Sequence, residues 1–307
     1  MENPRFMEKE AFYENYLDQL KKHKGMIHGL EIYEDGQLVF SYGDTVDHRY
    51  PIYSATKSIL SLAVGIAWDE RKLDLKRPLW DYMPSWVQEK PDMYQKDLYA
   101  NLTMERMLTM SVAGYPFRPE GENWLDTSLR LPLEGPEQVH FSYSNIPAYL
   151  VGVALSEALK EDLYEYMERK IFRPLDIQKP PVQRSPEGYV YGATGMELSV
   201  HELSKIGQVF YQNGVFNGER LVTEEYLKVA MQCHISNKGR SDTGNSDVGK
   251  RVSGKGRSEG YGYLIWTWED GVSIHGKWKQ RCYIAPKKQC MITFLADIKD
   301  DDFEQYP

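Results

Sequence analysis

The chain has 307 residues, of which 41% are hydrophobic and 27% are charged, a balance typical of a folded globular protein and not of a disordered one. Lys and Arg number 37 against 45 Asp and Glu, so the net charge of −8 argues against a nucleic-acid-binding protein. No segment approaches the roughly 18 consecutive apolar residues of a membrane span. The length allows one large domain or two lobes that share a core.

The N-terminal residues MENPRFMEKEAFYENYLDQLKKHKG lack the apolar stretch of a secretory signal, which predicts an amphipathic helix and a cytoplasmic protein. The three cysteines, Cys233, Cys282 and Cys290, form no C-x-x-C pair, and this favours reduced, buried thiols. Cys282 and Cys290 flank a predicted hairpin, so we expect that they can face each other across it.

Two β-rich runs, at 27–33 and 37–42, flank Asp35-Gly36, a dipeptide that favours a hairpin turn. From Ser54 the sequence is apolar almost all round, which predicts a helix buried at the centre of the molecule. From 73 to 189 many prolines interrupt the chain, and the clearest patterns are helical, near 103–110, 146–159 and 162–171. We expect a mostly helical lobe there.

After this lobe, Ser199-Val-His-Glu202 has the spacing of a capping box, and Thr223 opens a shorter helix. The segment 236–260 is rich in Gly and Ser and predicts a flexible surface loop, with a lid over a cleft as the alternative. Four β-rich runs follow, at 261–268, 272–276, 281–286 and 290–297.

These elements predict an α+β fold in which the first hairpin and the last strands join in one antiparallel sheet of about five strands, flanked by helices. Residues 1–72 and 190–307 are expected to form the lobe with the central sheet, and residues 73–189 to form an inserted, mostly helical lobe.

Ser54-Ala-Thr-Lys57 is the first candidate for chemistry. Residues three apart on a helix share a face, so the Lys57 amine can lie beside the Ser54 hydroxyl and take its proton. A buried lysine has a lowered pKa, and the start of a helix favours a developing oxyanion. The alternative is structural, with Ser54 as helix cap and Lys57 reaching solvent from the first turn. The pattern leaves both open.

Tyr143-Ser144-Asn145 is the second candidate. A tyrosine hydroxyl near a lysine can relay a proton, and an asparagine side chain can orient an amide. Several Tyr-x-Asn sequences occur in this chain, but this one leads directly into a strongly apolar helix, which would fix both side chains at the rim of a cleft. An exposed Tyr143 with Asn145 as the helix cap is equally compatible with the sequence.

Ser273-Ile274-His275-Gly276-Lys277, on a predicted inner strand, is the third candidate. A glycine within a strand often marks close approach of a ligand or of another backbone, and a strand N–H there can donate to an oxyanion. A bulge at a sheet edge is the alternative. His201-Glu202 lacks the second histidine of an H-E-x-x-H zinc site, and no phosphate-binding glycine loop occurs.

These three segments, in this order, resemble the motifs of the serine β-lactamase and penicillin-binding-protein superfamily, in which S-x-x-K carries the nucleophile. The likeness is greatest to its class C-like branch of β-lactamase-related serine hydrolases and esterases, whose second motif is Tyr-x-Asn. The third motif is closest to the His-Gly-x-x-Gly-Gln form, with Lys279 at the usual second glycine. The resemblance covers most of residues 26–297 and extends to PIYSATKSIL, RKLDLKRPLWDYMP, LTMERMLTMSVAG, YGATGMELSVHELSKIGQVFYQNG and HGKWKQRCYIAPKKQCMITFLAD.

The resemblance implies a β-lactamase/transpeptidase-like fold and a serine hydrolase that acts on an ester or amide through an acyl-enzyme, without a cofactor. Ser54 would be the nucleophile, and Lys57 and Tyr143 would share the role of base. The backbone N–H groups of Ser54 and Lys277 would hold the oxyanion. Asn145, His275 and Gly276 would position the substrate or tune the proton network.

The substrate is expected to be a small ester, amide or peptide, and the oligomeric state is not predicted. A D-amino-acid peptidase or amidase and a true β-lactamase are the alternatives among enzymes. A catalytically weak module that binds a peptide or a cell-wall fragment is the alternative outside that class. The walls of the expected cleft have three tryptophan candidates, Trp124, Trp266 and Trp268.

Overall fold

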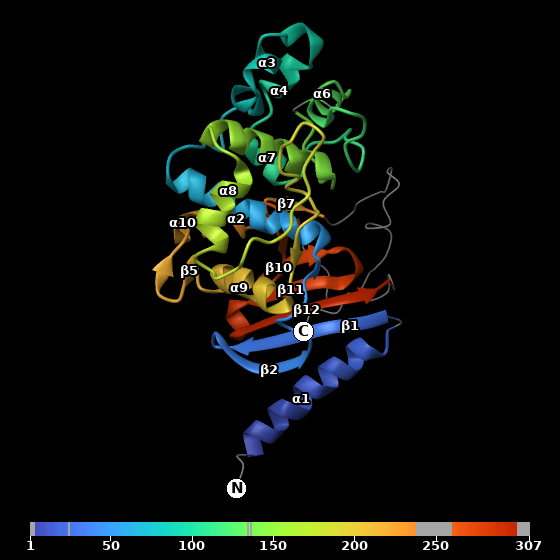
Figure 1. Cartoon of the computed structure of the whole chain (residues 1–307), viewed down its shortest axis with the longest axis vertical. Coiled ribbons are helices and arrows are strands. Elements are labelled where there is room, and N and C mark those ends of the chain that lie inside the picture. The colour runs from blue at the N-terminus through green and yellow to red at the C-terminus, as the bar shows by residue number, and fades with distance from the viewer. Residues whose placement is uncertain (1–3, 24, 134, 136, 238–259, 300–307) are drawn as a thin grey trace.

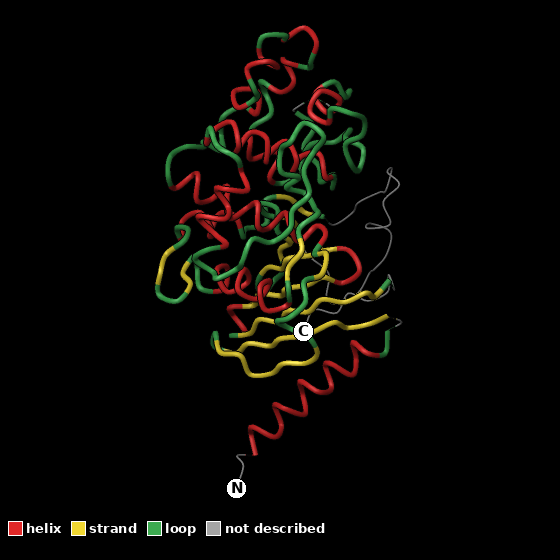
Figure 2. Tube along the Cα trace, viewed as in Figure 1, coloured by secondary structure: helices red, strands yellow, loops and turns green. Residues whose placement is uncertain are grey.

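The computed structural model describes residues 4–23, 25–133, 135, 137–237 and 260–299. The long strands lie together in the lower half of the view, with one long helix below them and most of the other helices above them (Figures 1 and 2). Helix α1 (Pro4–Lys21) lies beside the strands at one end, and the short helices of the middle of the chain lie at the opposite end. The predicted segment 236–260 falls mostly outside the described residues.

The sheet has eight strands in the order β2-β1-β12-β11-β10-β9-β8-β7, with antiparallel pairing throughout. The first hairpin joins the last strand, with Glu31 opposite Thr293, as the sequence predicts. Positive φ angles of 48° and 75° at Asp35 and Gly36 close the hairpin. The strands are β1 (Gly25–Glu34), β2 (Gln37–Gly43), β7 (Ile235–Ser236), β8 (Gly260–Tyr261), β9 (Trp266–Thr267), β10 (Val272–Gly276), β11 (Gln280–Ala285) and β12 (Cys290–Ile298).

The prediction of about five strands is therefore too low. The run 261–268 reverses direction and forms two strands, with Tyr261 paired to Trp266, and β7 extends the sheet beyond β8. Leu264 adopts a left-handed φ of 56° in this reversal. Gly262 permits it, because a Cβ there would lie 2.1 Å from the Ala230 carbonyl oxygen. This close approach depends on a helix distant in sequence.

The expectation for the cysteines is also wrong in two respects. Cys282 lies opposite Thr293 and Cys290 lies opposite Ala285, so the two thiols are not cross-strand partners. All three cysteines are free, as expected, but they are not all buried: Cys233 is exposed and Cys290 is half-buried, whereas Cys282 is buried.

Alternation along β1 assigns its residues to two covered faces. Leu30 and Ile32 pack with Leu17 and Leu20 of α1 in one apolar cluster. Glu31 points to the other face, where it contacts His201 of α9 (Val200–Tyr211). The capping box that the sequence predicts at the start of α9 is present, between Ser199 and Glu202.

Helix α2 (Thr56–Asp69) occupies the centre of the molecule, and every residue from Thr56 to Ala67 is buried, as its apolar sequence predicts. A 3₁₀ turn, η1 (Tyr53–Ala55), leads into it. Helices α7 (Asn145–Leu159) and α10 (Glu224–Ala230) pack against α2. Among the described helices, none is both long enough and apolar enough to cross a membrane.

Every named element of the described chain between 73 and 189 is helical. Besides α7, these are η2 (Leu79–Tyr82), α3 (Ser85–Gln88), η3 (Pro91–Met93), α4 (Lys96–Tyr99), α5 (Met104–Leu108), α6 (Trp124–Leu129), α8 (Leu163–Met167) and η4 (Glu168–Phe172). The remaining short strands pair as β3 (Tyr50–Pro51) with β4 (Glu197–Leu198) and as β5 (Val215–Phe216) with β6 (Glu219–Arg220).

Candidate active site

Ser54 and Lys57 lie one turn apart at the start of α2. The Lys57 Nζ donates a hydrogen bond to the Ser54 Oγ over 3.2 Å. The Lys57 side chain is 1% exposed, whereas Ser54 in the η1 turn remains partly accessible. Lys57 therefore does not reach solvent, which excludes the structural alternative for this residue.

The surroundings of Lys57 supply oxygen atoms but no negative charge among the described residues. Nζ also donates to the Asn145 Oδ1 at 2.6 Å and to the Ala193 carbonyl oxygen at 2.8 Å. Burial disfavours the ammonium form, and it lowers the pKa of Lys57 from 10.5 to about 7. The free amine is consequently well populated at neutral pH, beside a hydroxyl that needs a base.

The second predicted motif reaches the same place through the start of α7. Ser144 caps this helix by accepting from the Ile146 backbone N–H, so Asn145 is not the cap and its side chain faces Lys57. The Lys57 Nζ lies 5.0 Å from the centre of the Tyr143 ring. Tyr143 is 8% exposed, which contradicts the alternative of a solvent-exposed tyrosine.

An aromatic stack connects the second motif with the third. The Trp266 ring lies 5.5 Å from the Tyr143 ring and 5.6 Å from the His275 ring, stacked at 27° and 25°. The His275 Nε2 is 2.7 Å from the Ser273 Oγ. Burial, with the nearby charges of Arg281 and Lys279, holds the pKa of His275 well below its usual range, so its ring is neutral.

Gly276 brings the third motif against the chain that precedes the serine. A Cβ at this position would lie 2.1 Å from the Ile52 carbonyl oxygen, so only glycine permits the approach. Lys277 follows directly, with an exposed side chain at the start of the turn η5 (Lys277–Lys279). The strand end thus lies beside the segment that leads into Ser54.

The backbone is strained on both sides of this approach. Tyr53, immediately before Ser54, has a φ of 48°, and its ring meets that of Trp278 at 5.1 Å. Trp278 and Lys279 have φ values of 58° and 69°. Lys279 occupies the position of the usual second glycine, and its left-handed backbone explains why glycine suits it. Such strain is typical of functional sites.

Gln280 and Arg281 support the strained turn, a role that the sequence analysis did not assign. The Gln280 Nε2 donates to the carbonyl oxygens of Lys277 and Ala296, and the Arg281 guanidinium donates to that of Gly276 at 2.6 Å. The final glutamine of the His-Gly-x-x-Gly-Gln pattern, Gln280, is the sequence feature from which this role could have been predicted. The Ala193 carbonyl contact with Lys57 had no such signal, because any residue type supplies a backbone oxygen.

The other two tryptophans proposed for cleft walls have different surroundings. Trp268 is buried and its Nε1 donates to the Ser273 Oγ, so it supports the partner of His275. Trp124 packs edge-on against Tyr149 and Tyr191.

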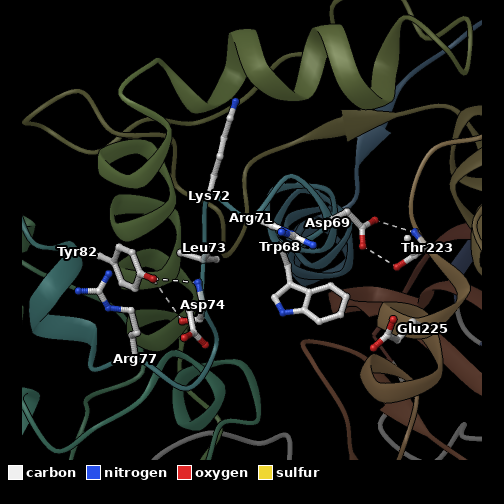
Figure 3. A pocket seen from close by; sticks show the side chains of 10 residues that line it. All are labelled: Trp68, Asp69, Arg71, Lys72, Leu73, Asp74, Arg77, Tyr82, Thr223 and Glu225. Carbon is white, nitrogen blue, oxygen red and sulfur yellow. Dashed lines mark hydrogen bonds between the residues drawn. The ribbon is translucent and has the colours of Figure 1, made fainter.

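Two surface cavities, of about 530 and about 310 Å³, lie around the C-terminal end of α2, and none of the predicted site residues lines either of them. Figure 3 shows the larger one.

Comparison with known proteins places this arrangement in a family. The model of the β-lactamase family matches residues 14–305. The 6-aminohexanoate-dimer hydrolase of Paenarthrobacter ureafaciens is 21% identical over 284 residues, which cover 85% of this chain and 69% of that protein.

Solved structures share the fold. The β-lactamase/D-alanine carboxypeptidase of Pseudomonas syringae has a TM-score of 0.67 and 12% identity, with 97% of this chain and 94% of the other covered. SurE with D-Leu has a TM-score of 0.72 and 18% identity, with 95% and 72% covered. The architecture is that of the β-lactamase- and penicillin-binding-protein-like class. The chain belongs to the β-lactamase family, and it is a hydrolase of that family.

Proposed function

We propose that this chain is a serine hydrolase that cleaves a carboxylic ester or amide through an acyl-enzyme on Ser54. The observation that carries the proposal is the contact between the buried Lys57 Nζ and the Oγ of the half-buried Ser54, 3.2 Å apart. A serine hydroxyl becomes an effective nucleophile only when a neighbouring group takes its proton. Lys57, with a pKa of about 7, is suited to that role near neutral pH.

In the proposed reaction, the Ser54 Oγ attacks the carbonyl carbon while its proton passes to Lys57, with Tyr143 sharing the transfer. The backbone N–H groups of Ser54 and Lys277 hold the oxyanion. Collapse breaks the bond to the leaving oxygen or nitrogen, which takes up the proton. Water then attacks the ester on Ser54, releases a carboxylic acid and restores the hydroxyl.

Two further residues keep the proton network in order. Asn145 accepts from Lys57, which fixes the direction of the amine toward Ser54. His275 is neutral and its Nε2 lies 2.7 Å from the Ser273 Oγ, so it contributes a fixed hydrogen-bonding imidazole and no charge. Both act by position and hydrogen bonding.

An amide is the substrate class that the relatives favour. One relative is named for hydrolysis of the 6-aminohexanoate dimer, and one solved relative is named β-lactamase/D-alanine carboxypeptidase. We therefore place amides and D-amino-acid peptides ahead of simple esters in the order of testing. β-Lactams are the third class of substrate to be tested.

The test is intact-protein mass spectrometry after incubation with a fluorophosphonate, in which the serine oxygen displaces fluoride and retains the phosphonyl group. We expect one adduct on the wild-type chain, none on Ser54→Ala, and an unchanged adduct on Ser41→Ala, a matched control on an exposed strand. A folded wild-type chain without an adduct, or an adduct that persists on Ser54→Ala, would refute the proposal. If Ser54 is labelled, the hydrolysis of amides, D-amino-acid peptides, esters and β-lactams by the chain is then measured.

A further inference from the structure

The cavity at the C-terminal end of α2 is a second place where a small molecule can bind. Its volume is about 530 Å³, within the range of roughly 300–1,000 Å³ that is usual for small-molecule sites. Ten residues line it: Trp68, Asp69, Arg71, Lys72, Leu73, Asp74, Arg77, Tyr82, Thr223 and Glu225. In Figure 3 the Trp68 indole lies between the loop after α2 and helix α10.

Six of these side chains carry charge, three positive and three negative. Most of that charge already has a partner within the protein. Asp69 accepts from the Thr223 backbone N–H and hydroxyl, at 2.7 and 2.6 Å. The remaining pairs are Lys72 with Glu70, Arg77 with Asp81, and the Asp74 carboxylate with the Lys76 backbone N–H.

Arg71 and Glu225 are different. Within the part of the chain that the structure describes, the Arg71 guanidinium and the Glu225 carboxylate have neither a hydrogen bond nor an ion pair. Arg71 belongs to the loop after α2 and Glu225 to the first turn of α10, so one unused cation and one unused anion line the same cavity from two separate elements.

Apolar side chains line the cavity together with these charges. Trp68 is half-buried and packs on Tyr226, with ring centres 6.0 Å apart. Leu73 and Tyr82 are 3% and 8% exposed. An indole surface of this kind favours contact with an aliphatic or aromatic body.

We propose that this cavity binds a small zwitterion, with its carboxylate on Arg71, its ammonium group on Glu225 and its apolar body against Trp68. A guanidinium binds a carboxylate through two parallel hydrogen bonds, which makes Arg71 the anion-binding residue. A simple anion would leave Glu225 unused, and a simple cation would leave Arg71 unused. The proposal does not depend on chemistry at Ser54.

The test is ligand-observed NMR titration of the full chain with linear ω-amino acids of increasing length, which measure the span between the two charges. We expect at least one length to bind, and its N-acetyl and methyl ester derivatives, each missing one charge, to bind at least about tenfold more weakly. Arg71→Gln and Glu225→Gln should each weaken the zwitterion similarly, while Arg71→Lys and Glu225→Asp retain part of the affinity.

Lys76→Gln removes an exposed cation of the same loop outside the lining and should leave binding unchanged. Thermal unfolding of each variant separates loss of binding from loss of fold. Three results would overturn the proposal: no length binds, the singly charged derivatives bind as well as the zwitterion, or binding survives both Arg71→Gln and Glu225→Gln in folded protein.

Discussion

The ionisable side chains at the two ends of helix α2, Lys57 and Glu70, have opposite surroundings. At the N-terminal end Lys57 is buried among a hydroxyl, an amide and a carbonyl oxygen, with no carboxylate beside it in the described chain. At the C-terminal end, burial alone would raise the pKa of Glu70, but hydrogen bonds from Lys170 and Lys72 lower it below its usual range. Burial without a counter-charge lowers the pKa of the Lys57 amine at one end, whereas two lysines keep the Glu70 carboxylate ionised at the other.

The largest effect expected from this contrast follows from removal of the base. Lys57→Met should slow fluorophosphonate labelling of Ser54 by roughly a thousandfold, because general-base assistance is lost. Lys72→Met, which removes a cation from the other end of α2, should keep the wild-type rate. The rates are measured by mass spectrometry over time. Wild-type labelling of a folded Lys57→Met chain would assign the base to another group.

The pH dependence of labelling sharpens the same point. The pKa of Lys57 is about 7, so the fraction of free amine increases roughly tenfold per pH unit below that value and levels off above it. The labelling rate should follow this curve. A rate that does not change across neutral pH, measured with a probe stable over the range, would contradict a lysine base.

The buried lysine also predicts how stability varies with pH. Between pH 7 and 10.5 the unfolded chain keeps the Lys57 proton and the folded chain does not. Folding therefore releases a proton, and the free energy of unfolding rises with pH, at up to about 1.4 kcal/mol per pH unit. Lys57→Met lacks this gain. Urea unfolding of both proteins at several pH values should show the free energy of unfolding of the wild type rising relative to that of the variant as pH rises. Parallel pH dependences would refute the lowered pKa of Lys57.

The smallest effect on labelling and stability is expected at the C-terminal end of α2, where Asp69 accepts from Thr223. Asp69→Ala removes the acceptor for the backbone N–H and hydroxyl of Thr223 and should lower the free energy of unfolding by about 1–2 kcal/mol. Labelling of Ser54 should stay at the wild-type rate in the folded variant. A large loss of labelling without unfolding would mean that the two ends of α2 are coupled, and the comparison would then fail.

Features that depend on neighbouring residues were predictable from the sequence. The hairpin at Asp35-Gly36, the capping box at Ser199 and the buried helix after Ser54 each follow from local propensity and periodicity. The closeness of Ser54 and Lys57 is of this kind too, because a spacing of three residues becomes one helical turn wherever the helix lies.

Features that depend on long-range approach were predicted poorly. At the reversal after β8, Gly262 passes so close to the Ala230 carbonyl that a Cβ would not fit, and the predicted number of strands was wrong there. The registers of Cys282 and Cys290 depend on how two strands align, which their flanking turn alone does not specify. That Arg71 and Glu225 line one cavity had no sequence signal, because the two segments come together around it only after α2 and α10 pack.

The sequence by itself determined which residue types are available and which lie one helical turn apart. Only the tertiary structure decided that Lys57 is buried without a counter-charge, because Asn145 and Ala193 come from segments 88 and 136 residues away. It is this packing, and not the Ser-x-x-Lys spacing, that excludes water from the amine and lowers its pKa.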